Sequence, residues 1–414
     1  MTPSAPPGPQ PEEDYIPETL DMPIPAEMLA QAAQNVATAP APARPASAEE
    51  QEIAFDFDTF MRMAIAQGVS DIHLRVGTPP TLRKDGEMVQ TRLAPLSERD
   101  MMKFAKTIIP ANILPRLKNR SDFDFGIQFE NSVRFRVNLF YEMNRLGMVL
   151  RLIPLKIPSL SELGHPPVIE RFTELNQGLV LVTGPTGSGK TTTLAAMLNT
   201  INEKRQKHII TLEDPVEFVY QSRSSIVTQR QLGLDTDSFP NGVKYALRQD
   251  PDVLLIGEMR DRETMMAALH ASETGHLVFS TLHTVDSVQT INRIINAFEP
   301  YERDAIRHQL AGVLQGTISQ RLVKRAEGQG RLAVAEIMVV SPAIRDYIMR
   351  EEMDEIYQLL KAGEFEGTCS LNHSLYMACR NQLIKAEDAL SISENKSELH
   401  QMMRGAFQGS QGLG

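Results

Sequence analysis

The chain has 414 residues, 42% of them hydrophobic and 23% charged, an ordinary globular composition with room for two or three domains. The net charge of −10 is uneven: residues 1–50 hold eight acidic residues and one basic residue, so the remainder is nearly neutral, which disfavours a protein that binds mainly nucleic-acid backbones. With only two cysteines, we expect neither a disulfide framework nor a zinc site. The sequence has no apolar stretch of about 18 residues and no signal-peptide pattern, so we expect a cytoplasmic protein that meets a membrane only through a partner.

The N-terminal part of the chain begins with a segment rich in Pro, Ala and acidic residues. We expect a disordered tail over residues 1–51, because such a segment cannot bury enough apolar surface to offset its chain entropy. Apolar residues from Phe57 to Ile65 then recur at helical spacing, and "SDIHLRV" and "SVRFRVNLF" alternate as strands do. In the second strand Arg134 and Arg136 share the polar face. These patterns predict a small α+β domain over 52–157, followed by a Pro-bearing linker region over 158–174.

From residue 175 onward, strands alternate with helices. The segments "GLVLVTG", "HIITLEDP", "DVLLIGE" and "HLVFSTLH" are short apolar runs, each followed by a helical pattern, which indicates a parallel sheet covered by helices. After residue 300 the pattern is mostly helical, apart from a hairpin near "GRLAVAEIMVV". We expect an α/β domain over 175–405 with a helical C-terminal region, and a flexible tail over 406–414.

A glycine-rich turn follows the first of these strands. Gly184, Gly189, Lys190 and Thr191 fit the pattern G-x-x-x-x-G-K-[ST], with a strand before it and an amphipathic helix after it. The backbone N–H groups of such a turn surround phosphates, Lys190 reaches the β and γ oxygens, and the Thr191 hydroxyl can bind Mg²⁺. The sequence therefore predicts an ATP site formed by Gly184, Pro185, Thr186, Gly187, Ser188, Gly189, Lys190, Thr191 and Thr192.

Acidic residues follow two of the predicted strands. ATP hydrolysis needs a carboxylate near the γ-phosphate and acids that hold Mg²⁺ through its water shell. Two acidic clusters behind a phosphate-binding turn favour this function over solvated loop charges: Glu258 ends one strand, while Glu213, Asp214 and Glu217 end another. We expect Glu213 and Asp214 to support Mg²⁺ together with Thr191. His276 and His283 flank a further strand, and their residue type leaves open whether they are structural or sense phosphate.

Four segments resemble the Walker A, Asp box, Walker B and His box of the secretion ATPase superfamily: "VTGPTGSGKTTTLAAMLN", "TLEDPVEF", "LRQDPDVLLIGEMRD" and "ASETGHLVFSTLHT". From "SDIHLRVGTPPTLRKDG" to "EIMVVSPAIRDYI" the chain looks like the PilT-type retraction ATPases of type IV pili. The resemblance implies a RecA-like phosphate-loop ATPase domain preceded by a PAS-like domain, assembled as a homohexamer. It also implies that Glu258 is the Walker B glutamate and base, that Glu217 supports Mg²⁺ and water, and that His276 and His283 report the γ-phosphate.

The resemblance further implies a mechanical cycle. Arg134, Arg136 and Arg151 would reach the nucleotide, although a solvated strand edge is the alternative for the first two. ATP would lie between one subunit's ATPase domain and the next subunit's N-terminal domain, and hydrolysis would pivot the domains about "PLKIPSLSELGHPP". The motor would act at the pilus base on an inner-membrane platform protein, with a second retraction ATPase as a further partner, to depolymerise pilin and drive twitching motility.

Several features keep other functions open. Gly257 stands where many phosphate-loop enzymes have an aspartate that directs Mg²⁺. "AIRDYI" differs from the retraction motif "AIRNLI" at Asp346 and Tyr347, so an accessory PilU-like ATPase is an alternative. Two cysteines disfavour the extension and type II secretion ATPases, which carry a four-cysteine module. The nearly neutral body and the absence of Trp disfavour a nucleic-acid translocase, and Glu217 and Glu258 disfavour a scaffold that binds ATP without hydrolysing it.

Overall fold

The computed structural model describes residues 56–84, 86–109, 122–130, 133–153, 156–328, 330–363 and 367–405. The tails predicted over 1–51 and 406–414 lie outside these residues. The chain divides into two compact units, with the boundary between Phe104 and Ala105, and each unit is described here by itself.

The first unit packs two helices against short antiparallel strands. It contains α2 (Phe57–Ala66), β1 (Asp71–Arg75), β2 (Thr81–Lys84), β3 (Glu87–Gln90) and the start of α3 (Glu98–Ile108). The side chain of Asp56 caps α2 by accepting a hydrogen bond from the Thr59 N–H at 3.0 Å. The rings of Phe57 and Phe104 lie 4.8 Å apart in a core of fully buried side chains. The predicted helix and first strand are thereby confirmed.

The second unit begins with an antiparallel run of three strands, β4 (Phe123–Phe129), β5 (Val133–Glu142) and β6 (Arg145–Ile153). Phe135, Val137 and Leu139 are fully buried on one face of β5, as the alternating pattern predicts. Arg136 alternates with them and is the register partner of Arg151 on β6. The polar face of β5 therefore continues onto β6.

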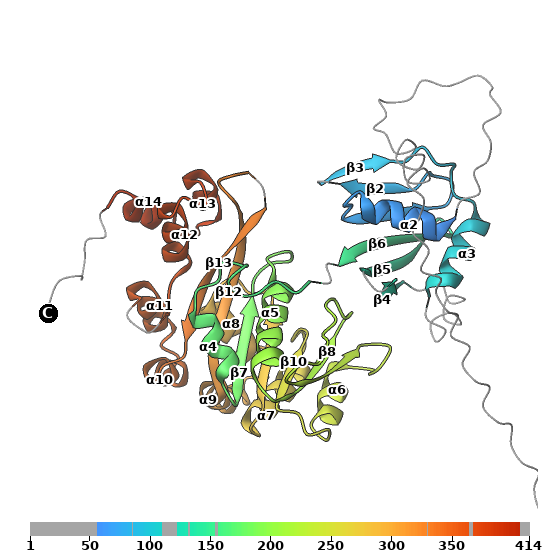
Figure 1. Cartoon of the computed structure of the whole chain (residues 1–414). Coiled ribbons are helices and arrows are strands. Elements are labelled where there is room, and N and C mark those ends of the chain that lie inside the picture. The colour runs from blue at the N-terminus through green and yellow to red at the C-terminus, as the bar shows by residue number, and fades with distance from the viewer. Residues whose placement is uncertain are drawn as a thin grey trace, which may run out of the picture. The chain divides into compact units, whose positions relative to one another are not determined.

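A seven-stranded sheet forms the centre of the second unit (Figure 1). Its strands lie in the order β13-β12-β7-β11-β10-β8-β9, and all paired neighbours are parallel except β12 and β13. The parallel sheet and the terminal hairpin are confirmed. The strands are β7 (Gly178–Thr183), β8 (His208–Glu213), β9 (Ile226–Gln231), β10 (Val253–Ile256), β11 (Leu277–Leu282), β12 (Leu314–Lys324) and β13 (Arg331–Val339).

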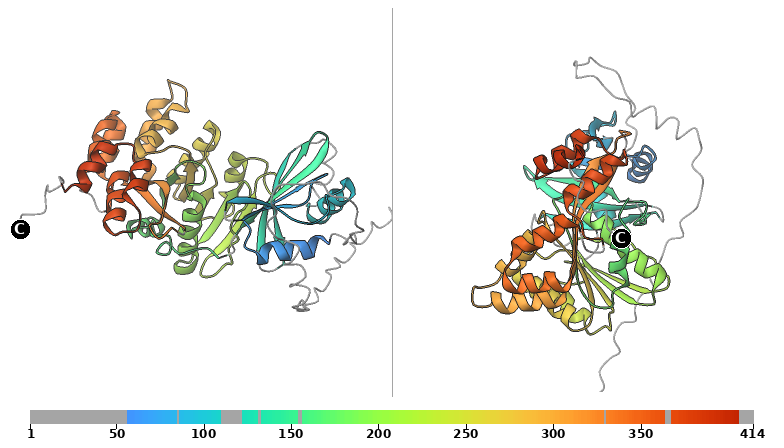
Figure 2. Two further views of the ribbon diagram at one scale, coloured as in Figure 1. Left: turned by 90° about the horizontal axis from the view of Figure 1, so that it is seen from above. Right: turned by 90° about the vertical axis from the view of Figure 1, so that its left-hand side faces the viewer.

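Helices cover both faces of this sheet, as Figures 1 and 2 show. Alternate residues of β7 point to opposite faces: Val180 and Val182 pack with α4 (Val168–Glu174) and α5 (Lys190–Lys204). Leu179 and Leu181 pack in the core of the other face. That face is covered by α6 (Phe239–Ala246), α7 (Arg262–Glu273), α8 (Ser287–Asn296), α9 (Arg303–Val313), α10 (Pro342–Arg350) and α11 (Met353–Ala362). The ends of β12 and β13 pack with α12 (Leu371–Arg380), α13 (Ala386–Ile392) and α14 (Lys396–Met403).

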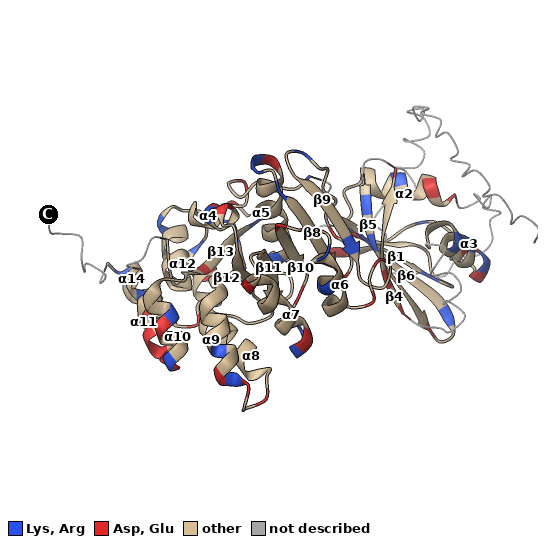
Figure 3. Cartoon of the chain, turned by 90° about the horizontal axis from the view of Figure 1, so that it is seen from below, with Lys and Arg blue, Asp and Glu red and all other residues tan. Residues whose placement is uncertain are grey.

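Besides β9, the sequence pattern did not predict strand β12. It carries Thr317, Ser319 and Gln320, whose side chains are 0–1% exposed, so its buried residues do not form an apolar run. Charged residues of both signs lie next to each other on α10 and α11 (Figure 3), and one such pair is Arg350 with Asp346 at 2.8 Å. Among the described residues no helix has both the length and the apolar character needed to cross a membrane.

Candidate functional site: a phosphate-binding loop between acidic strand ends

The glycine-rich turn joins the end of β7 to the start of α5. Gly184 has a φ of 138° and Gly189 a φ of 88°, in the region that disfavours residues with a Cβ. A Cβ on Gly184 would collide with the carbonyl oxygen of Gln320, so any larger residue would displace the loop. No side chain caps α5, and its first N–H groups remain available to an anion.

Lys190 is the first residue of α5, and its side chain reaches back to the turn. Its Nζ donates hydrogen bonds to the carbonyl oxygens of Gly184 at 2.8 Å and Pro185 at 3.1 Å. Burial lowers the pKa of this ammonium group, while the charges of Glu258 and Glu217 oppose that shift. The buried Ser188 hydroxyl has no hydrogen-bond partner in the described part of the chain. A curled backbone, a cation and an unpaired hydroxyl are together the groups that a phosphate would use.

The strand-end residues Glu258 and His283 meet beside this loop. His283 Nε2 lies 3.6 Å from Glu258 Oε2, and Arg260, which the sequence analysis missed, contacts Glu258 Oε1 through Nη2 at 2.6 Å. Burial and the Glu258 charge raise the pKa of the Asp214 carboxyl, which Arg260 partly offsets. A cavity of about 700 Å³ is lined by residues 186–192 and by Arg136, Arg151, Glu213, Asp214, Glu217, Glu258, Arg260 and His283, among others.

Glu213 is held by neighbouring side chains. Its Oε1 accepts hydrogen bonds from the Thr211 hydroxyl at 2.6 Å and from Gln229 Nε2 at 3.1 Å, and burial raises its pKa. The described residues contain no group of three His, Cys, Asp or Glu side chains that could hold a metal ion. The residues present still fit Mg²⁺, because this ion keeps several waters and uses one or two protein ligands together with substrate phosphates. The predicted contribution of Thr191, Glu213 and Asp214 stays a prediction.

Two of the three predicted arginines contact the acidic loop after β8, within the second unit. Arg134 Nε donates to the Val216 carbonyl at 3.3 Å, and Arg136 Nη1 lies 3.5 Å from Glu217 Oε1. Burial lowers the pKa of Arg134, with Glu213 opposing the shift. The resemblance assigned these arginines to the neighbouring subunit's site, whereas here they approach the acids of their own chain.

His276 does not lie with the other predicted site residues. It precedes the six-residue strand β11, whereas His283 follows that strand. His276 Nδ1 lies 3.0 Å from the Ala271 carbonyl oxygen at the end of α7, and His276 does not line the cavity. Of the two histidines predicted for the His box, therefore, His283 is the one that lies beside the phosphate-binding loop within one chain.

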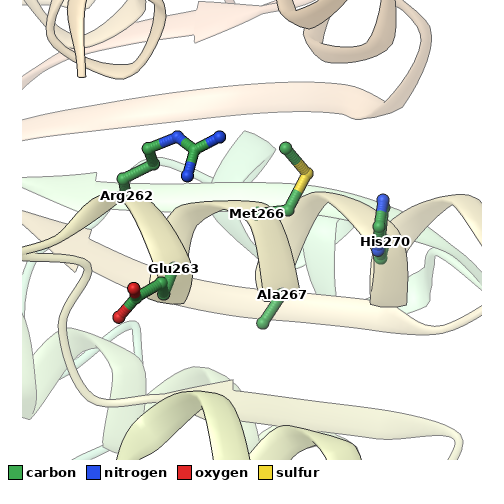
Figure 4. A pocket seen from close by; sticks show the side chains of 5 residues that line it. All are labelled: Arg262, Glu263, Met266, Ala267 and His270. Atoms are coloured by element: carbon green, nitrogen blue, oxygen red, sulfur yellow. The ribbon is translucent and has the colours of Figure 1, made fainter. Parts of the chain in front are cut away.

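A second pocket, of about 270 Å³, runs along α7 and is lined by residues of that helix. Figure 4 shows Arg262, Met266 and His270 projecting from one side of the helix, and Glu263 and Ala267 from the other side in this view. Arg262 forms an ion pair with Glu302 and lies 5.6 Å from the centre of the Phe298 ring. None of these residues belongs to the phosphate-binding loop or its acids.

The parallel sheet, the glycine-rich loop and the acids at neighbouring strand ends define the class of phosphate-loop nucleotide-binding proteins. Residues 46–370 match the family described as Type II/IV secretion system protein, and the chain belongs to this family. It is 41% identical over 340 residues to the type IV pilus retraction ATPase PilT of Pseudomonas aeruginosa, covering 81% of this chain and 97% of the relative.

Two further similarities bear on function. The type IV pilus ATPase PilU of Pseudomonas aeruginosa is 36% identical over 349 residues, covering 84% of this chain and 91% of the relative. A solved structure described as the pilus retraction motor PilT with bound ADP has a TM-score of 0.78 and 39% identity, covering 84% of this chain and all of that chain. The mixed α/β fold is thus that of a known ATPase.

Proposed function

We propose that this chain is an ATP-hydrolysing motor that retracts type IV pili and so drives twitching motility. The observation that carries the proposal is the cavity at the glycine-rich loop, where Lys190 shares the lining with Glu217 after β8 and Glu258 after β10. A site that only binds a nucleotide needs the loop, whereas hydrolysis also needs carboxylates near the γ-phosphate. The similarity to PilT over most of both chains supports retraction as the work done.

The residues would divide the chemistry as follows. The loop N–H groups and Lys190 bind the β- and γ-phosphates, and Glu258 accepts a proton from the attacking water. Mg²⁺, held by the Thr191 hydroxyl and, mostly through water, by Glu213 and Asp214, would neutralise charge on the phosphates. Glu217 orients water, and His283, next to Glu258, detects loss of the terminal phosphate. Arginines such as Arg136 stabilise the transferring group, a role worth about 10³–10⁵ in rate.

The assembly belongs to the same proposal. Residues 52–157 form a PAS-like domain, residues 175–405 form a RecA-like domain, and six chains form a ring at the cytoplasmic face of the inner membrane. The ring acts on a membrane-embedded platform protein, with a second retraction ATPase as a further partner and without direct contact to nucleic acid. Hydrolysis pivots the two domains about the linker that precedes α4.

An accessory, PilU-like role is the second candidate, and Asp346 and Tyr347 within the retraction motif favour it. The similarity to PilU covers 84% of this chain. Deleting the gene and imaging pili separates the functions: we expect over-piliated cells for a retraction motor. An accessory ATPase predicts cells with nearly normal pili, and bald cells would indicate an extension motor.

Phosphate release from the full chain with ATP and Mg²⁺ tests the enzyme. Lys190→Ala should reduce turnover at least a hundredfold, because it removes the cation that contacts the β- and γ-phosphates. Lys204→Ala is the matched control, since Lys204 ends the same helix, is exposed and pairs with Glu170 outside the cavity. Unchanged turnover in Lys190→Ala, or no phosphate release from the unsubstituted chain, would contradict the proposal.

A further inference from the structure

Four buried polar residues join the segment before α4 to the phosphate-binding loop. His165 Nε2 lies 2.8 Å from the Thr193 hydroxyl, which donates a hydrogen bond to Gln320 Oε1 at 2.8 Å. Gln320 Nε2 in turn donates to the carbonyl oxygen of Ser188 at 2.7 Å. The four residues come from the linker, the first turn of α5, strand β12 and the loop itself.

The direction of these hydrogen bonds is fixed by their chemistry. The Thr193 hydroxyl has one proton, and it is donated to Gln320, so His165 must donate from Nε2. The amide of Gln320 accepts through its oxygen and donates through its nitrogen, which leaves no alternative orientation that satisfies both neighbours. Burial lowers the pKa of His165 to about 4, so its imidazole is neutral and keeps this single-donor form at neutral pH.

Burial makes each of these bonds necessary. Thr193 and Gln320 are each 1% exposed, Ser188 is 4% exposed and His165 is 9% exposed. A buried polar group without a partner is unfavourable, so loss of one member destabilises the arrangement of the others. Gln320 also lies directly against the loop, because a Cβ on Gly189 would be 2.7 Å from its Nε2.

We propose that His165, Thr193 and Gln320 form a positioning relay that holds the phosphate-binding loop in its binding geometry and couples nucleotide occupancy to the linker segment 156–167. The relay fixes the Ser188 carbonyl, and with it the peptide that turns N–H groups toward phosphate. When nucleotide binding moves that peptide, the side chains of Gln320 and Thr193 transmit the movement to His165. The inference rests on the proposed function, since the linker is where the motor's domains would pivot, and it names the residues that carry the signal.

Hydrogen exchange of the full chain, with and without ADP, measures this coupling directly. In the unsubstituted chain we expect ADP to slow exchange both in the loop and in residues 156–167. In His165→Leu, which removes the donor to Thr193, the linker should lose this response while the loop keeps it. His165→Gln should restore the response, because its Nε2 can replace the imidazole donor.

Nucleotide affinity gives a second readout. Gln320→Met, which is close in volume but has no amide, should weaken ADP binding about tenfold and abolish the linker response. His208→Leu is the matched control: His208 Nε2 also contacts a threonine hydroxyl, that of Thr228, at 3.1 Å, but at the opposite end of β8 from the acids. This variant should bind ADP as the unsubstituted chain does.

The outcomes separate the relay from the proposed function. Absence of ADP binding in the unsubstituted chain would overturn both. Normal binding with a linker that does not respond to ADP, or a full linker response in His165→Leu, would overturn the relay alone. A loss of affinity in His208→Leu equal to that in Gln320→Met would show a general packing effect and would also overturn it.

Discussion

Glu258 and Glu217 both line the cavity at the phosphate-binding loop, but they contact different side chains. Glu258 ends β10 and contacts both Arg260 and His283, whereas Glu217 lies in the loop after β8 with Arg136 beside it. The contact of Arg260 with Glu258, at 2.6 Å, is shorter than that of Arg136 with Glu217, at 3.5 Å. The proximity of His283 to Glu258 links that carboxylate to the group proposed to sense the γ-phosphate.

We therefore expect Glu258→Gln to bind ATP normally and to hydrolyse it about 10²–10⁴ times more slowly, the range expected for loss of a general base. Glu217→Gln should also reduce turnover while retaining binding. Phosphate release and fluorescent-nucleotide titration measure the two properties separately. Glu263→Gln on α7 is the control and should match the unsubstituted chain. Unaltered turnover in Glu258→Gln would remove this residue from the proposed chemistry.

At the level of elements, a strand could be predicted from the sequence where its apolar residues form an unbroken run. Strand β7 is buried along its whole length and reads as an unbroken apolar run, so both it and the loop after it are predictable. Strand β12 was missed because its buried positions include Thr317, Ser319 and Gln320. It pairs with β7 so that Ser319 lies opposite Thr183. This pairing brings Gln320 to Thr193, although the two residues are more than 120 positions apart in the sequence. The register between β12 and β7 cannot be predicted from a local sequence pattern.

The same limit applies to the two histidines of the His box. Sequence spacing puts His276 and His283 on either side of an apolar run, and both fit a phosphate sensor equally well. Only the strand direction tells them apart, because β11 is parallel to β7 and therefore ends where the loop begins. The acids could be predicted for the same reason: strand ends in a parallel sheet meet at one edge.

Buried His165 gives the segment before α4 a pH-dependent stability. Burial lowers its pKa from 6.5 to about 4, so below pH 6.5 the unfolded chain binds a proton that the folded chain does not. Stability should fall as the pH falls through this window, by about 2 kcal/mol between pH 7 and pH 5. Urea unfolding followed by circular dichroism should show a smaller loss in His165→Gln. Gln320→Met keeps the histidine and should keep the loss; equal pH dependence in His165→Gln and the unsubstituted chain would contradict this account.

At the scale of the whole molecule, the question is which chain completes each site. The resemblance to ring-forming ATPases places the arginine strands against a neighbouring subunit, but Arg136 lies 3.5 Å from Glu217 of its own chain. Arg151 is the register partner of Arg136 and lines the same cavity. This arrangement favours a site whose loop, acids and arginines all come from one chain.

Mixing two inactive variants tests this arrangement. Lys190→Ala has intact arginines and Arg136→Ala has an intact loop, so a site shared between neighbouring subunits would be rebuilt in mixed rings. We expect phosphate release from the mixture to equal the sum of the separate variants, because no chain in it carries both groups. Mixing the unsubstituted chain with Lys190→Ala is the control for subunit exchange and should change its activity. Recovery well above the sum, once exchange is established, would mean that the arginines act across the subunit boundary and that the contact between Arg136 and Glu217 is not the catalytic one.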